Sequence, residues 1–273
     1  MNFFARRRLR NTLLCLVGMV LAYGLWRMLK IALRPAAIYT GFALLALVLA
    51  LALFNGRKKL PFLPLMKASS WLQFHIYAGW LSVFVFLLHS GFRLPTGMLE
   101  TILSVLFVIV ALSGVAGLFI TRLLPPAITR SGEPLVYERI PRYQHALRTE
   151  VEGIVEDAER QSGSTAMGNF YMSTLAPYFQ RRSSVLLLAG NPSRHSQRIL
   201  GQMDEYCRYL DEELVGSMGR LRECVERKRN LDFQNAAQRL LKLWLFVHIP
   251  FTYSLIIVAL VHAWVALVYG GRL

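Results

Sequence analysis

Four of the six histidines in this 273-residue chain fall into two pairs with the same spacing. His75 and His89 lie 14 positions apart in one apolar segment, and His248 and His262 have the same separation in another. With about 3.6 residues per turn and a rise of about 1.5 Å per residue, this spacing places both rings on one face of a helix, about 21 Å apart along its axis. Each segment therefore offers imidazoles at two depths.

Ionisable residues inside a bilayer are costly and usually face a partner, a cavity or a cofactor. Neutral imidazole is a good axial ligand for haem iron. A haem ligated from both sides needs one histidine from each of two helices, and two stacked haems need this arrangement twice. Equal spacing lets the two segments pair at both levels, and two spans with one span between them run in the same direction. Together these predict that His75 pairs with His248 and His89 with His262, around two b haems. The sequence has no C-x-x-C-H site for covalent haem attachment.

Other roles for these histidines stay open. A membrane histidine can hydrogen-bond a neighbouring helix or relay protons, so a non-redox scaffold or transporter component is the alternative interpretation. Structural zinc is disfavoured, because it needs four clustered ligands and the two levels are about 20 Å apart.

Small residues accompany the predicted ligands on the same helix faces. They leave room for a flat macrocycle, which large side chains would block. These residues are Ala78, Gly79 and Ser82 after His75, and Ala259 and Ala263 around His262. Pro250 removes a helical hydrogen bond near His248 and is expected to bend that helix.

Several charged residues flank the predicted sites. Lys67 and Arg57 on one side of the membrane, and Arg93 and Arg272 on the other, are candidates to pair with haem propionates. Interfacial anchoring of the spans is the alternative for all four. Glu100 could accept protons from a quinol, or it could be a first-turn acid favoured by the helix dipole.

Plainer roles are expected for the remaining candidates. The sequence "SGVAG" at 113–117 is typical of a close-packing surface of small residues. Trp80 and Tyr253 are expected to be packing or interfacial residues, and His145 and His195 to be solvated.

The elements that must position these residues are membrane helices. Hydrophobic residues make up 55% of the chain and the mean hydropathy is +0.40, which is too apolar for an ordinary soluble protein. About 20 apolar residues are needed to span a bilayer as a helix, and five segments qualify: 11–29, 36–54, 71–92, 98–120 and 241–269. No A-x-A cleavage site follows the first segment, so we expect a retained helix and not a signal peptide.

The acidic residues separate a membrane part from a water-soluble part. Only Glu100 precedes residue 121, and the other fifteen lie between Glu133 and Asp232. We therefore predict spans 1 to 4 in residues 1–120, an insert at 121–240 and span 5 in 241–273.

The insert is expected to be a helical hairpin. After the breaker "LPPAITRSGEP", apolar residues recur at helical spacing from Ile140 to Ala158, and again along a single helix over 196–229. The stretch "SSVLLLAG" between them is short enough for a strand or a buried helical turn.

Basic residues predict the orientation. Arg6, Arg7, Arg8 and Arg10 at the N-terminus lie on the same side as the basic connection at 57–67. This bias places the N-terminus and the insert in the cytoplasm and the C-terminus outside, in a bacterial inner membrane. The net charge of +15 borders apolar spans, which favours anionic lipid over nucleic acid as the partner. The three cysteines are not expected to form disulfides, because the insert faces the reducing side.

The H-x13-H pattern in the third and fifth spans resembles the ferric reductase-like transmembrane domain and, more loosely, other di-haem b-type cytochromes. The resemblance covers the membrane half of the chain. It implies that His75, His89, His248 and His262 ligate two stacked b haems that pass electrons across the bilayer. The long insert is not typical of this group. No flavin or nicotinamide domain follows residue 273, so a separate flavin, iron–sulfur or c-type haem subunit, or a quinol, is expected to exchange electrons with the haems.

These observations predict an all-α membrane protein, with five transmembrane helices in a haem-binding bundle and a helical cytoplasmic insert between spans 4 and 5. Its expected function is electron transfer between a quinol or cytoplasmic donor and an acceptor outside. It would be the electron-transfer subunit of a quinol dehydrogenase or a ferric reductase-like oxidoreductase. The direction of electron flow and the place of a quinone site stay open.

Overall fold

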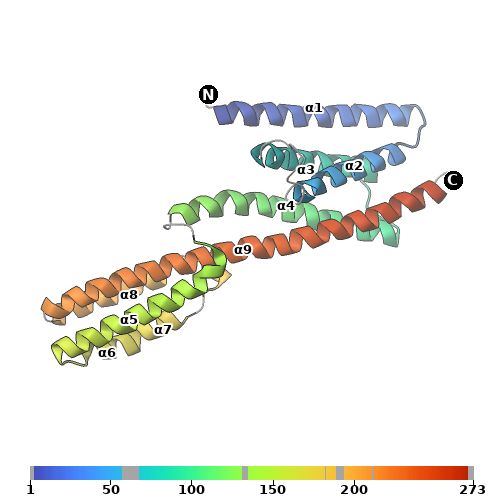
Figure 1. Cartoon of the computed structure of the whole chain (residues 1–273). Helices are drawn as coiled ribbons and strands as arrows, with labels where there is room; N and C mark the ends of the chain where they lie inside the picture. Colours follow the sequence, from blue (N-terminus) through green and yellow to red (C-terminus); the bar gives the residue numbers. More distant parts are fainter. Residues whose placement is uncertain are drawn as a thin grey trace. The chain divides into compact units, whose positions relative to one another are not determined.

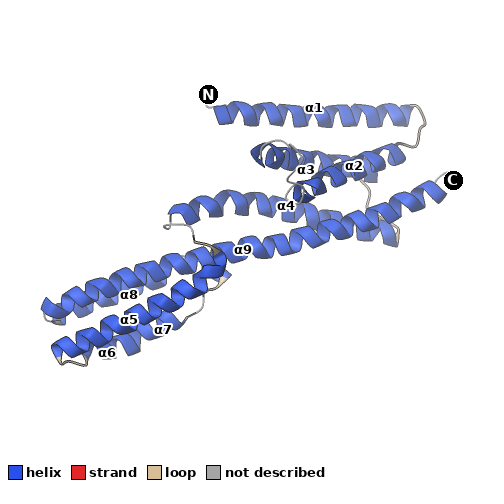
Figure 2. Cartoon of the chain, viewed as in Figure 1, coloured by secondary structure: helices blue, strands red, loops and turns tan. Residues whose placement is uncertain are grey.

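The computed structural model describes residues 3–56, 68–130, 135–181, 183–188, 194–210 and 212–269. Over these residues the secondary structure is helical and contains no strand, so the all-α prediction is confirmed (Figure 2). The helices are α1 (Phe3–Ile31), α2 (Ala36–Gly56), α3 (Ala68–Ser90), α4 (Met98–Arg130), α5 (Ile140–Ser162), α6 (Ala166–Phe170), α7 (Ala176–Gln180), α8 (Arg194–Tyr206) and α9 (Glu212–Tyr269), as Figure 1 shows.

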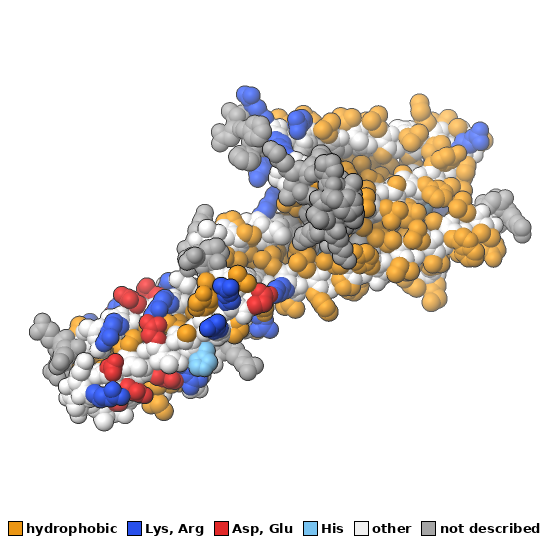
Figure 3. Space-filling model, in the orientation of Figure 1, with side chains coloured by type: hydrophobic (Ala, Val, Ile, Leu, Met, Phe, Trp, Pro, Cys, Tyr) orange, Lys and Arg blue, Asp and Glu red, His pale blue; other side chains and the backbone are white. Residues whose placement is uncertain are grey.

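Five of these helices are long and apolar enough to cross a membrane: α1, α2, α3, α4 and α9. Each corresponds to one of the five segments predicted from hydropathy, although α3 ends at Ser90, two residues before the predicted end. The chain is an integral membrane protein on this criterion. Space-filling colours show the same division, because apolar side chains cover the region of α1 to α3 whereas charged side chains gather over α5 and its neighbours (Figure 3).

The chain forms two compact units, and each has its own core. The first, here the membrane unit, comprises Met1–Leu118 and Leu245–Leu273; the second, here the insert unit, is Phe119–Trp244. Helices α4 and α9 contribute residues to both.

Helix α1 packs along α3 through polar side chains as well as apolar ones. Arg7 Nη2 donates to Ser70 Oγ at 2.8 Å, and Asn11 Nδ2 donates to Gln73 Oε1 at 2.6 Å. Hydrogen bonds between successive turns of two helices fix their axial register. They therefore hold α3, which carries the first histidine pair, at a defined height.

Apolar packing joins α2, α3, α4 and α9 into one bundle. Val48 of α2, Phe107 of α4 and Leu255 of α9 are buried together. Phe86 of α3 stacks on Phe107, with ring centres 4.3 Å apart and planes inclined by 13°. The two helices that carry the histidine pairs are thus packed against the same two neighbours, α2 and α4.

The insert unit buries most of the apolar stripe predicted for α5. Ile140, Leu147, Val151, Ile154 and Ala158 are buried in the structure, whereas Tyr143, also predicted for the stripe, is exposed. Leu147 and the later members pack, with side chains from α6, α7, α8 and α9, into one core. Full burial of a large aliphatic side chain contributes about 1.5–3 kcal/mol, so this core accounts for the hairpin-like arrangement of the long helices.

The prediction of one continuous helix over 196–229 is wrong. Helix α8 ends at Tyr206, a 3₁₀ turn covers Cys207–Tyr209, Leu210 is extended, and α9 begins at Glu212. Arg222 of α9 pairs with Asp204 of α8, because the chain has turned back on itself. Both helices face one core, so the apolar spacing continues through a turn that no glycine or proline marks.

Two further local predictions are corrected. Helix α4 does not end at the breaker but continues through Pro125 and Pro126 to Arg130. Proline has a helical φ, so the helix can continue although each ring removes an N–H donor and crowds the carbonyl four residues earlier. The stretch "SSVLLLAG" contains a 3₁₀ helix at Val185–Leu188, and Leu186 is exposed. The helical alternative therefore holds there, without the burial that was expected for it.

One charged pair is buried in the insert unit. The Lys228 side chain is 2% exposed; its Nζ donates to Asp232 Oδ2 at 2.6 Å and to the Arg181 carbonyl at 3.3 Å. Asp232 also accepts a hydrogen bond from Gln144 Nε2 at 2.8 Å. Removing one member of a buried ion pair leaves the charge of the other buried without a partner.

We predict that Lys228→Met lowers the free energy of unfolding by about 3–5 kcal/mol, because it leaves the Asp232 carboxylate buried without its cation. The double variant Lys228→Met/Asp232→Asn should recover most of this loss, since it removes the stranded charge and keeps the bond to Gln144. Urea unfolding of the full chain in detergent, followed by circular dichroism, measures both. A double variant as unstable as the single one would contradict this account.

Candidate haem site

The structure brings the histidines of α3 and α9 together at two levels. The ring centres of His75 and His248 are 6.4 Å apart, and those of His89 and His262 are 6.3 Å apart. The ring planes are inclined by 71° and 85°. The earlier histidine of each helix meets the earlier one of the other, so α3 and α9 run in the same direction, as expected of two spans separated by one other span.

The separation of the rings fits a metal between them. An imidazole nitrogen lies about 1.2 Å from its ring centre and about 2.0 Å from a metal that it binds, so two rings on opposite sides of one metal have centres about 6.4 Å apart. Edge-to-face packing of two aromatic rings covers about 4.5–7 Å and includes the same value. The ring distance therefore fits both a metal between the rings and direct packing of the rings. The hydrogen bonds made by the Nδ1 atoms help to distinguish the two.

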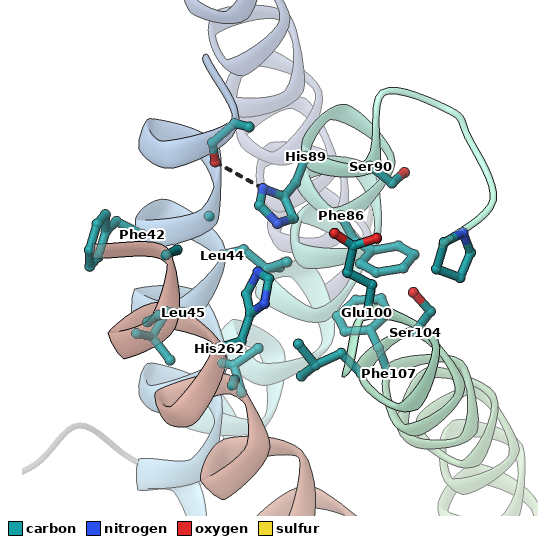
Figure 4. Close-up of a pocket in the computed structure, with 18 of the residues that line it drawn as sticks. Phe42, Leu44, Leu45, Phe86, His89, Ser90, Glu100, Ser104, Phe107 and His262 are labelled. Atoms are coloured by element: carbon teal, nitrogen blue, oxygen red, sulfur yellow. Dashed lines mark hydrogen bonds between the residues drawn. The ribbon is translucent and has the colours of Figure 1, made fainter. Parts of the chain in front are cut away.

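His89 is held by the backbone of α2. Its Nδ1 lies 3.0 Å from the Ala37 carbonyl oxygen, a contact drawn as the dashed line in Figure 4. A carbonyl oxygen only accepts hydrogen bonds, so Nδ1 carries the proton and Nε2 keeps its lone pair. The Thr40 hydroxyl lies 3.3 Å from the same Nδ1 and donates to the Ala36 carbonyl at 2.8 Å. His89 is thus fixed in the tautomer that a metal ligand needs.

His248 is held by a side chain of α4. Its Nδ1 lies 2.7 Å from Ser113 Oγ, and Ser113 Oγ donates its hydrogen to the Val110 carbonyl at 2.9 Å. A serine hydroxyl has one proton, so when that proton bonds the Val110 carbonyl, Oγ accepts the hydrogen bond from Nδ1–H. Nε2 of His248 is therefore the acceptor nitrogen as well. Such support of the non-ligating nitrogen is usual for histidines that bind metals.

A cavity of about 380 Å³ surrounds the pair of His89 and His262. This size is within the usual range for ligand and cofactor pockets. In Figure 4 the two rings face the same space, with Phe86 and Phe107 beside them. The lining is mainly apolar and comes from α2, α3, α4 and α9, together with the 91–97 connection. A mainly apolar lining with two facing imidazoles suits a porphyrin.

Small and charged residues predicted from the sequence lie at this cavity. Ala259 and Ala263 of α9 line it. Arg93 lines it as well, just after α3, where Gly91 adopts a left-handed conformation (φ +61°) and the chain reverses. Glu100 reaches the same cavity, and its Oε2 lies 3.4 Å from the Thr96 backbone nitrogen, as expected of a first-turn acid.

The other predicted residues lie elsewhere. Ala78 and Ser82 are buried on α3, and Ser82 Oγ donates to the Gly79 carbonyl at 2.8 Å. They do not line the cavity around His89 and lie closer in sequence to His75, so their role beside a haem stays a prediction. Lys67, Arg57 and Arg272 fall outside the described residues.

Sequence reasoning missed the neighbours that α2 and α4 supply. A Cβ at Gly41 would lie 2.9 Å from His89 Cε1, and one at Gly114 would lie 3.8 Å from His248 Cε1. Ser113 and Gly114 begin the "SGVAG" stretch, which suggested only close packing. Gly41 stands in an ordinary apolar run and gave no signal.

Metal sites of other kinds find no support within the ranges that the structure describes. No group of three or more histidine, cysteine, aspartate and glutamate residues is suited to hold a metal ion there. Two histidines alone suffice for an iron whose remaining ligands come from a macrocycle. The residues present therefore fit a haem better than a zinc ion.

No known family model matches the chain, and neither a characterised protein nor a solved structure is significantly similar to it. The fold and the site by themselves define a helical integral membrane protein with five candidate spans and two facing histidine pairs.

We predict that Gly41→Ala disturbs the site of His89 and His262, because its Cβ would lie 2.9 Å from His89 Cε1 and force the ring to move. A loss of haem affinity of roughly 10-fold at that site is expected, comparable with the loss of an outer-shell contact. Gly114→Ala is the matched control, since its Cβ would meet His248 at an ordinary 3.8 Å. Bound haem per chain and low-spin ferric EPR signals report the result. Equal effects of the two substitutions would contradict it.

Proposed function

We propose that the chain is a di-haem b-type cytochrome that moves electrons across a membrane. His75 and His248 would hold an inner haem, and His89 and His262 an outer one. The observation that carries this proposal is the double pair of facing rings, 6.4 Å and 6.3 Å apart. The bonds that direct Nε2 of His89 and His248 away from their helical supports add to it.

When bound, the two haems would supply one-electron oxidation and reduction, which no side chain at the site can perform. The chain contributes position and environment. Fourteen residues along α3 separate the two levels by about 21 Å, which spans most of a hydrocarbon core about 30 Å thick. Apolar residues from four helices keep water from the outer level, and Arg93 offers a cation for a propionate there.

The orientation and partners follow from charge. Arginines at the start of α1 favour a cytoplasmic N-terminus, which also places the insert unit in the cytoplasm of a bacterial cell. Electrons would then pass between a quinol or cytoplasmic donor and an acceptor outside the inner membrane. The chain would serve as the electron-transfer subunit of a quinol dehydrogenase or a ferric reductase-like enzyme, beside a flavin, iron–sulfur or c-type haem subunit.

We predict that the purified full chain, produced with ample haem, shows a b-type band in a dithionite-reduced minus oxidised spectrum, with two haems per chain. Single substitutions of histidine by alanine should then fall into two classes. His75→Ala and His248→Ala should remove one haem signal, and His89→Ala and His262→Ala the other, because each pair meets at one level.

His145→Ala and His195→Ala are the controls, since both residues belong to the insert unit and should leave both haem signals intact. If the two members of one pair affect different haems, the assigned pairing is wrong. If the wild-type protein has no b-type band, the rings contact each other directly, and the chain is a non-redox scaffold or transporter component.

A further inference from the structure

The two best-defined ligands are supported by different kinds of group. The Nδ1 of His89 faces a main-chain carbonyl, that of Ala37, which any residue at position 37 would supply. The Nδ1 of His248 faces a side-chain hydroxyl, that of Ser113, at 2.7 Å. Only the second support depends on the identity of one amino acid.

Ser113 also connects His248 to the backbone of α4. Its proton goes to the Val110 carbonyl at 2.9 Å, and its lone pair accepts from Nδ1–H of His248. Hydrogen bonds in such a chain polarise one another and strengthen. Ser113 Oγ, which accepts the hydrogen bond from the imidazole, is therefore a better acceptor than the hydroxyl of an isolated serine would be.

An acceptor at Nδ1 makes the opposite nitrogen a stronger electron donor. A stronger donor favours the oxidised, more positive iron over the reduced one, so it lowers the reduction potential. The hydrogen bond also fixes the rotation of the ring about its own axis. A Cβ at the neighbouring Gly114 would lie at an ordinary 3.8 Å from His248 Cε1, so the hydrogen bond does not depend on a glycine there.

We propose that Ser113 is a positioning residue that orients His248 and lowers the reduction potential of the inner haem through the chain from Nδ1–H to Oγ to the Val110 carbonyl. This inference rests on the proposed function, because it requires a haem at His248. It assigns a specific role to a serine that the sequence alone suggested was part of a packing surface.

Ser113→Ala tests the inference in the purified full chain with its haems bound. The expected result is an upward shift of the midpoint potential of one haem, the one that His248→Ala removes, with no shift of the other. A roughly 10-fold faster loss of that haem to apomyoglobin is expected too. Ser113→Thr keeps the hydroxyl and should restore the wild-type potential.

Thr101→Ala is the matched control on the same helix. Thr101 Oγ donates to the Gly97 carbonyl at 2.8 Å, as Ser113 Oγ does to Val110, but Thr101 is exposed and belongs to the other end of α4. Its removal should leave the inner haem unchanged. Ser113→Cys retains most of the volume with a weaker acceptor, and should shift the same potential upward even if the alanine variant does not accumulate.

The outcomes separate this inference from the proposed function. Two haems in Ser113→Ala or Ser113→Cys with unchanged potentials would overturn the role of Ser113 and leave the cytochrome intact. Equal shifts of both haems would also overturn it, because they would show a general change of packing. A wild-type protein without haem would overturn the proposed function itself.

Discussion

An imidazole in a membrane has two nitrogens to satisfy, and the bundle is organised around that requirement. For His89 and His248, one nitrogen donates to a neighbouring helix and the other faces a histidine across the bundle. The acceptors lie on different helices, that of His89 on α2 and that of His248 on α4. Four helices must therefore hold their positions together, and a shift of any one would break a bond that no water could replace.

Direction and register follow from the same requirement. Two equal spacings can meet at both levels only if the levels of α3 and α9 coincide, and the structure satisfies this with the two helices parallel. The polar contacts between α1 and α3 set the height of one of these helices. Stacking of Phe86 on Phe107 secures it laterally against α4. Helix α1 thus contributes to the site without touching it.

The sequence predicts those parts of the fold that depend on local pattern. Apolar runs define the five spans, and a separation of 14 residues defines which histidines share a face, because both depend only on helix geometry. The residues that hydrogen-bond to the histidine rings or leave space for them could not be predicted. Ser113 and Gly41 act on histidines far along the chain, and only the packing of α2 and α4 brings them close.

The turn between α8 and α9 is a feature that a local sequence pattern fails to predict. Its apolar residues keep a helical spacing because both helices bury their faces in one core, so periodicity gives no sign of the reversal at Cys207–Tyr209. Pro125 and Pro126 mislead in the other direction, since α4 continues through them. A regular apolar spacing shows which residues are buried, and a proline shows where a backbone N–H is missing. Neither shows by itself where a helix ends.

The place of α9 after the insert unit has a consequence for biogenesis. His248 and His262 are translated roughly 170 residues after the partners they meet. At a synthesis rate of about 5–20 residues per second, the rings of α3 wait roughly 10–30 s in the membrane with their counterparts not yet made. Neither pair can close while the ribosome is still producing the insert. Any prosthetic group that needs both rings can therefore be captured only after α9 has been synthesised.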